Sequence, residues 1–383
     1  MQTLTSNISP IANCQSPIAN GQCTESTRLP WLDFASGIMI LWMIVYHAIV
    51  VAWGYEARDL WGITDASSLP EGMHAFINSE GKLEVLNPCV AFPWLHFFMP
   101  WFFYKSGQFF NKTNTKDLWK KDSQKLLKTF VIWSAVGYVF FLLFSLLDDS
   151  ITLRGCTYSI LRHLFLCGEI PINGPLWFLL TLFGVRFVAN KILPERGDKC
   201  AVWKVLAVVT IGYVTSYLAY RYNHHLLPYW MANGAAGLVF FALGYAMRGC
   251  DTKWWIIVPC CIVYLMCCIQ GFTTVDMLFN KLLSGIYEIW IPLSLCGIIV
   301  YNALCNLLYK YVQLGIIEYI GRHAMLIYVT HFIIAKLVIF VLNVLDLQIQ
   351  SALLVLMVLL AYVLFIPIIN YILKLFKNEN SFF

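Results

Sequence analysis

One histidine lies deep within a long apolar segment. His47 belongs to the run LDFASGIMILWMIVYHAIVVAW, which extends from Leu32 to Trp53 and carries Asp33 near its start. About 20 apolar residues span the hydrocarbon core of a bilayer, so this run predicts a transmembrane helix. A buried imidazole is costly there, and it changes its charge near neutral pH, so His47 is a candidate general base. The alternative is a histidine that only hydrogen-bonds between packed helices.

Other polar residues in apolar segments sort into two layers when each helical residue is counted as about 1.5 Å of depth. The outer-to-middle layer holds residues that exchange protons: His47, His96, Glu288 and His331. The inner layer, called here the cation layer, holds Lys105, Arg186 and Arg322. Cationic side chains suit phosphate, so this arrangement would serve a transferase with a phosphorylated donor inside and an acceptor outside. Lys105 and Arg186 could instead extend to the inner headgroups.

Apolar helices must position these residues. Of the 383 residues, 60% are hydrophobic and only 12% are charged, whereas a soluble domain carries roughly 25% charged residues. We therefore expect an all-α, polytopic integral membrane protein of about ten transmembrane helices. The predicted spans lie near 32–54, 91–110, 127–147, 175–193, 201–220, 230–247, 254–270, 284–307, 323–343 and 350–373. Residues 156–174 are compatible with an interfacial helix.

Positive charges orient these spans. Of the 26 Lys and Arg residues, 17 fall in inner segments, 6 in outer segments and three within spans if the N-terminus is cytoplasmic. The positive-inside rule then places both termini in the cytoplasm. We expect a disordered cytoplasmic lead over 1–31, one transmembrane domain over 32–376 and a cytoplasmic tail over 377–383. No basic patch interleaved with aromatic residues lies outside the spans, so no nucleic-acid partner is expected.

The connection NKTNTKDLWKKDSQKLLK, between the second and third spans, is basic and amphipathic. It could lie along anionic headgroups, or it could simply set the topology. Membrane lipids are thus expected partners, whereas the oligomeric state is open.

The 13 cysteines do not predict a metal site. Most of them lie in apolar segments, and the group at 260, 261, 267 and 268 lacks the further ligands that a closed zinc site needs. Cys89, Cys156 and Cys167 fall in expected outer loops and could form a disulfide.

Four segments carry motifs in a fixed order: LDFASGIMILWMIVYHA, FFMPWFFYKSGQFF, GPLWFLLTL and IGRHAMLIYVTHFI. In order and spacing, over roughly 32 to 335, they resemble membrane acyltransferase family three, which includes O-acetyltransferases of bacterial surface polysaccharides. The resemblance implies a multi-pass enzyme of the cell (inner) membrane. It also implies acetyl-CoA as the acyl donor, a glycan or lipid-linked sugar as the acceptor, and no metal.

The first segment departs from the family pattern at one position. The family usually has Arg, or Lys in some branches, eleven residues before the first-span histidine, and Ser36 stands there in this chain. If that cation helps to hold acyl-CoA, its loss affects donor binding or activity itself. Our hypothesis is that Lys105, at similar depth on the next span, replaces it.

The resemblance gives the remaining residues candidate roles. His47 would be the base, or a transient acyl carrier, for transfer to a sugar hydroxyl. His331 and Tyr328, one helical turn apart, would orient His47 or stabilise the oxyanion. The cation layer and Ser36 would bind the donor. Candidate substrate-binding residues are Trp177, Glu288 and His96, although packing or solvation would equally explain them.

Two other functions fit the same features. A transporter or flippase of glycan precursors would also have ten spans and buried charges, but no internal repeat and no paired broken helices are evident. A catalytically inactive relative is the third reading, which Ser36 keeps open.

Overall fold

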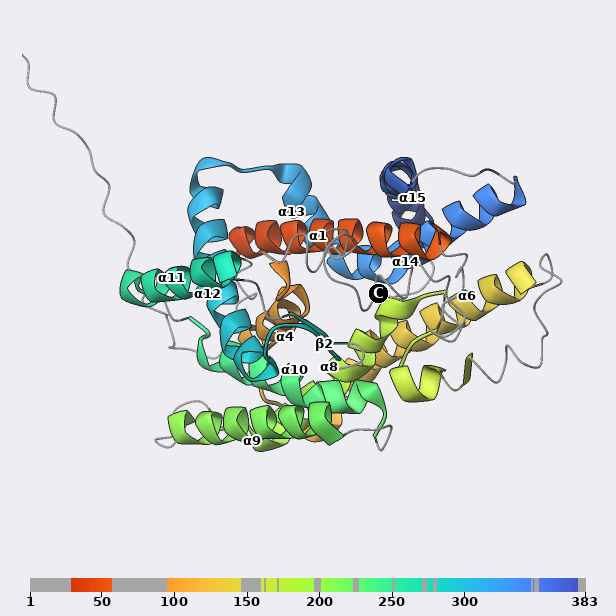
Figure 1. Cartoon of the computed structure of the whole chain (residues 1–383). Coiled ribbons are helices and arrows are strands. Elements are labelled where there is room, and N and C mark those ends of the chain that lie inside the picture. Colours follow the sequence, from red (N-terminus) through yellow and green to blue (C-terminus); the bar gives the residue numbers. More distant parts are fainter. Residues whose placement is uncertain are drawn as a thin grey trace, which may run out of the picture.

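The structure, a computed structural model, is mainly helical (Figure 1). It describes residues 29–56, 95–145, 160–195 without 162 and 171, 201–222, 227–249, 252–270, 274–277, 281–345, 347 and 351–377. The longer helices are α1 (Pro30–Glu56), α4 (Phe98–Gln108), α6 (Lys128–Ser145), α8 (Trp177–Ile192), α9 (Ala201–Tyr222), α10 (Tyr229–Ala246), α11 (Trp254–Gln270), α12 (Tyr287–Tyr311), α14 (Ala324–Val344) and α15 (Ser351–Lys377). Residues 1–28 and 378–383, which hold most of the expected lead and tail, lie outside the described residues.

Each predicted span overlaps one of these helices, although α4 covers only about half of the span predicted at 91–110, and the helical membrane fold is confirmed. Among the described residues, six helices are long and apolar enough to cross a membrane, and two further apolar helices are shorter. The number of ten spans and the orientation of the termini therefore stay predictions. The segment at 160–167 is helical, as expected for an interfacial helix, apart from residue 162, which is not described.

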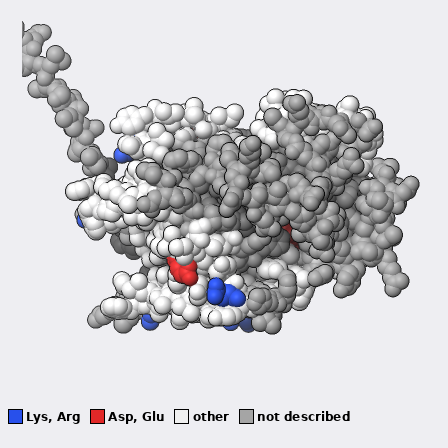
Figure 2. Space-filling view, in the orientation of Figure 1, with Lys and Arg blue, Asp and Glu red and all other residues white. Residues whose placement is uncertain are grey.

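The outer surface of the helices is apolar. Trp203 on α9, Trp254 on α11 and Val363 on α15 are each at least 69% exposed. On the face in Figure 2, charged side chains occupy only small separate spots among uncharged described residues. A surface of this kind is stable against lipid, which agrees with the apolar sequence of the helices.

The helices pack in two groups. In the first group, α1 contacts α12, α14, α15 and the short helix α13 (Gly315–Arg322). In the second group, α10 contacts α4, α8 and α9. Figure 1 shows α1 and α13–α15 in the upper part of the view and α4 and α8–α10 in the lower part. His47 of α1 and His331 of α14 both lie in the first group, whereas Lys105 of α4 and Arg186 of α8 lie in the second.

Glycines from the sequence motifs permit close helix contacts. A Cβ atom at Gly321 of α13 would collide with the Asp33 carbonyl oxygen of α1, and one at Gly107 of α4 would collide with the Phe241 carbonyl oxygen of α10. Small residues let helix backbones approach closely, which is how membrane helices commonly associate. The Gly321 contact joins the first and fourth motif segments directly.

Three elements were not expected from the sequence. The first is α13. The second is an antiparallel hairpin of β1 (Thr274–Asp276) and β2 (Lys281–Ser284), with Val275 paired to Leu282. The third is a π-helical turn, η4 (Ser123–Leu127), which joins α5 (Thr115–Asp122) to α6. The basic connection is therefore helical, with Leu118, Asp122 and Leu126 buried at intervals of four residues and most of its lysines exposed.

Candidate active site

Two histidines from different helices form a hydrogen bond. His331 Nε2 of α14 lies 3.0 Å from His47 Nδ1 of α1. His331 is fully buried, whereas His47 is only partly buried. We call these two residues the histidine pair. His47 is thus the member that a substrate can reach.

The partners of His331 determine where the protons lie. Its Nδ1 is 2.8 Å from the Tyr328 carbonyl oxygen and 3.1 Å from the Ile327 carbonyl oxygen. Carbonyls only accept hydrogen bonds, so Nδ1 must carry a proton. In a neutral His331 the Nε2 then accepts a hydrogen bond from His47 Nδ1–H. A neutral His47 consequently has its lone pair on Nε2, where it can act as a base or a nucleophile.

Aromatic side chains surround the pair. The His47 ring lies 5.5 Å from the ring of Phe332 and 5.1 Å from that of Tyr46, both edge-on. Tyr328 is buried, its hydroxyl donates to the Pro175 carbonyl oxygen, and its ring is 5.7 Å from Phe178 of α8. An oxyanion role for Tyr328 would require this hydroxyl to leave the carbonyl.

Trp177 begins α8 directly after the turn η5 (Gly174–Leu176) and is buried. Its ring centroid lies 6.3 Å from that of Phe178, which itself contacts Tyr328. Glu169 also belongs to this region. Its Oε2 and the Phe332 ring both lie against Gly174, at 3.2 and 3.9 Å from the position that a Cβ atom would take there. Sequence reasoning missed Glu169, since it falls in the short segment before α8 rather than inside an apolar run.

Lys105 of α4 reaches Ser36 of α1. Its ammonium donates to the Ser36 hydroxyl, which itself donates to the Leu32 carbonyl oxygen. Ser36 is fully buried and Lys105 half-buried. The structure therefore brings a cation to the position where the family pattern has one. Its role in donor binding stays a prediction.

Arg186 of α8 forms an ion pair with Asp122 of α5. Its Nε lies 2.7 Å from Asp122 Oδ2 and its Nη2 lies 3.1 Å from Oδ1, a bidentate geometry, and Asp122 is only 3% exposed. A guanidinium held in this way is already neutralised. Asp122 was missed because it lies in a lysine-rich segment in which an acidic residue looks solvent-exposed.

The remaining candidates lie in other surroundings. Arg322 is exposed at the end of α13. Glu288 is exposed at the start of α12, where its main-chain carbonyl accepts from the Tyr213 hydroxyl. His96 is buried, with Nε2 3.5 Å from the Ser294 hydroxyl and its ring stacked on Tyr264. His96 is therefore a packed residue between helices, whereas the Glu288 side chain lies at the surface.

The two chemical regions are separated along α1. His47 follows Ser36 by eleven residue steps, which correspond to about 16 Å at 1.5 Å per residue. A donor that used both regions would have to extend along the helix with its charged end at Lys105 and its reactive end at His47.

The comparisons with known proteins gave one match. The model of a family described as an acyltransferase domain matches residues 29–372, which is most of the chain. No curated protein and no solved structure matches.

Proposed function

The chain belongs to this acyltransferase family, and we propose that it transfers an acetyl group from cytoplasmic acetyl-CoA to a sugar hydroxyl of a surface or lipid-linked glycan. The family membership and the apolar helices support a multi-pass acyltransferase of the membrane. The hydrogen bond between His47 and His331 is the observation that carries the proposal, because it leaves the Nε2 lone pair available on His47, the partly exposed member of the pair.

His47 is the general base of the proposed reaction. The hydroxyl proton moves to His47 Nε2 as the sugar oxygen attacks the thioester carbonyl carbon. A carbon–oxygen bond forms, the carbon–sulfur bond breaks, and the thiolate of CoA takes the proton from His47. His331 is a positioning residue, since its Nε2 accepts from His47 Nδ1–H and stabilises the imidazolium while it exists.

His47 could also carry the acetyl group in two steps. In that route Nε2 attacks the thioester carbonyl carbon, the carbon–sulfur bond breaks and CoA leaves as the thiolate, which gives an N-acetylimidazolium with Nδ1–H still donating to His331. The sugar oxygen then attacks the acetyl carbon, the carbon–nitrogen bond breaks, the hydroxyl proton passes to the released His47 Nε2, and the CoA thiolate takes that proton. The same tautomer serves both routes, so geometry does not separate them. Labelled acetyl groups would accumulate on the protein in the second route alone.

The donor binds along α1. Lys105, held at Ser36, contacts a phosphate of CoA, and Arg322 at the exposed end of α13 contributes a second cation. Arg186 supports this end of the molecule through Asp122. On the acceptor side Trp177 is the preferred sugar platform, because it lies next to the aromatic group around the pair.

The decisive experiment uses purified full-length protein, acetyl-CoA radiolabelled in the acetyl group, and a glycan-lipid extract from the source membrane. Label in the glycan supports the proposed transfer, and label on the protein that moves to glycan on addition of extract supports the two-step route. No transfer at all, with movement of glycan precursors across proteoliposomes, would instead establish the transporter. Absence of both activities would favour the inactive relative.

A further inference from the structure

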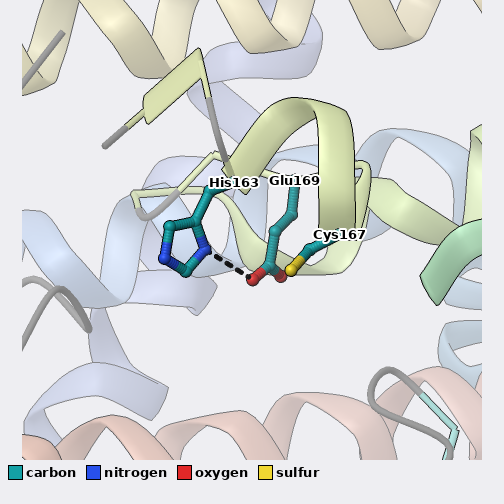
Figure 3. A group of neighbouring side chains, drawn as sticks. All are labelled: His163, Cys167 and Glu169. Atoms are coloured by element: carbon teal, nitrogen blue, oxygen red, sulfur yellow. Dashed lines mark ion pairs between the residues drawn. The ribbon is translucent and has the colours of Figure 1, made fainter. Parts of the chain in front are cut away.

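Three side chains of metal-binding types converge just before α8. His163 and Cys167 are four residues apart in a helical segment, and Gly168, with a φ of 72°, turns the chain so that Glu169 returns toward them. Their ligand atoms all lie within 4.8 Å of one another. Figure 3 shows the three side chains pointing toward a common centre. No residue of this group takes part in the proposed acyl transfer.

One nitrogen in the group has no hydrogen bond. His163 Nδ1 is buried, and within the described part of the chain no donor or acceptor reaches it. It lies 3.7 Å from Glu169 Oε1, which is an ion-pair distance for a protonated imidazole (Figure 3) but is beyond a hydrogen bond. A buried polar atom without a partner costs free energy, so a ligand that engages it would stabilise the segment.

The spacing of the ligand atoms fits a tetrahedral metal ion. Zinc bonds of about 2.0 to 2.3 Å place two ligand atoms roughly 3.3 to 3.8 Å apart. The 3.7 Å between His163 and Glu169 falls in this range, and 4.8 Å is the upper limit for every pair. The two most widely separated ligand atoms must therefore approach each other by about 1 Å, which rotation of the side chains allows.

The chemistry of the donors selects the metal. A cysteine sulfur with a histidine nitrogen and a carboxylate oxygen is typical of zinc, whereas calcium and magnesium prefer oxygen alone. Cys167 is a buried thiol and Glu169 is 7% exposed. A thiolate and a carboxylate together balance the charge of Zn²⁺, so the complex with a neutral histidine is neutral. Neutrality favours binding in a buried site next to apolar helices.

We propose that His163, Cys167 and Glu169 bind a zinc ion, with water in the fourth position. Binding displaces the Cys167 thiol proton to solvent. Because all three ligands lie in one segment, the ion rigidifies the turn that precedes α8. Further along the chain, Asn173 Nδ2 donates to the Val329 carbonyl oxygen at 3.0 Å and joins this region to the helix of His331. The zinc site is independent of the acyl transfer.

The test measures metal in the full-length protein purified in detergent through a tag that binds no metal. Elemental analysis after zinc loading and gel filtration is expected to give about one zinc per chain. Cys167→Ser, His163→Ala and Glu169→Gln are each expected to lower this at least tenfold. Cys261→Ser, which changes a thiol on α11, is the matched control and is expected to keep the zinc.

Cobalt gives a second measurement that needs no variant. Titration of the metal-free wild-type protein with Co²⁺ is expected to produce a thiolate-to-cobalt charge-transfer band, which zinc then removes. A wild-type protein that binds neither metal would overturn the proposal, as would zinc that persists in Cys167→Ser. Mass spectrometry that found Cys167 in a disulfide in the native protein would overturn it too.

Discussion

The histidine pair and the cation layer differ in how completely the fold assembles them. His331 is fully buried and bound through both ring nitrogens, so it holds His47 in one orientation and one tautomer. In the cation layer, Lys105 donates a hydrogen bond to Ser36. Arg186 is neutralised by its ion pair with Asp122, and Arg322 is exposed. The reactive group is thus preorganised, whereas the charges that would bind a donor are dispersed over three helices.

Because of this difference, we expect the two regions to control different kinetic parameters. A preorganised base lowers the barrier of the chemical step, so its loss should reduce kcat. A dispersed set of cations contributes binding free energy in small separate parts, so single losses should raise KM for the donor. Substitutions in the two regions therefore separate kcat from KM.

The largest effect is expected for His47→Ala. Removal of a general base lowers kcat by about 10³-fold, because the sugar hydroxyl then loses its proton acceptor. Initial rates of transfer from labelled acetyl-CoA measure this. His323→Ala, which removes an imidazole at the start of α14, is the control and should leave the rate unchanged. Turnover in His47→Ala close to that of the wild type would remove the base from the mechanism.

His331→Leu should have the next largest effect. It deletes the acceptor for His47 Nδ1–H at similar volume, and a misplacement of about 1 Å can cost roughly 10²-fold in rate. We expect kcat to fall while KM for acetyl-CoA stays constant. His331→Gln, whose amide oxygen can accept the same hydrogen bond, should recover most of the rate. Equal losses of kcat in His331→Leu and His331→Gln would mean that His331 acts through packing alone.

Lys105→Ala should raise KM for acetyl-CoA at least tenfold with little change in kcat, because a charge-assisted hydrogen bond contributes roughly 1.5 to 3 kcal/mol and about 1.4 kcal/mol corresponds to a factor of ten. Lys310→Ala, at the exposed end of α12, is the matched control. Adding Ser36→Arg to Lys105→Ala restores a cation at the family's usual position and should recover the donor affinity. Near-normal kinetics of Lys105→Ala would show that Lys105 does not replace the missing cation.

Arg186→Ala should have the smallest kinetic effect and act on stability instead. It leaves the buried Asp122 carboxylate without its ion pair, which costs about 3 kcal/mol. Thermal unfolding in detergent measures this loss, and Arg186→Gln combined with Asp122→Asn should recover part of it. A raised KM with unchanged stability would make Arg186 a donor ligand, as the sequence alone suggested.

The sequence predicted the helices well because each lies within a long apolar run of the sequence. It also placed His47 and His331 in one layer and Lys105 at a depth similar to that of Ser36, since depth follows from residue counting. It could not predict which faces of the helices contact one another. The rotation of each helix depends on packing contacts such as that of Gly321 with the Asp33 main chain. Depth alone therefore grouped Glu288 and His96 with the histidine pair, although their contacts lie elsewhere.

Asp122 and Glu169 escaped prediction for a related reason. Both are buried carboxylates in short connecting segments, where neither hydropathy nor periodicity marks an inward side chain. The π-helical turn η4 that follows Asp122 and the positive φ of Gly168 before Glu169 are local backbone features that become visible only in three dimensions.

The most direct test of the central claim is a double-mutant cycle on the histidine pair. kcat/KM would be measured for the wild type, His47→Ala, His331→Leu and the double variant. Residues that act as one unit give strongly non-additive losses. We predict that the double variant is no slower than His47→Ala, because His331 works only through His47. A double variant slower by the product of the two single losses would contradict this account.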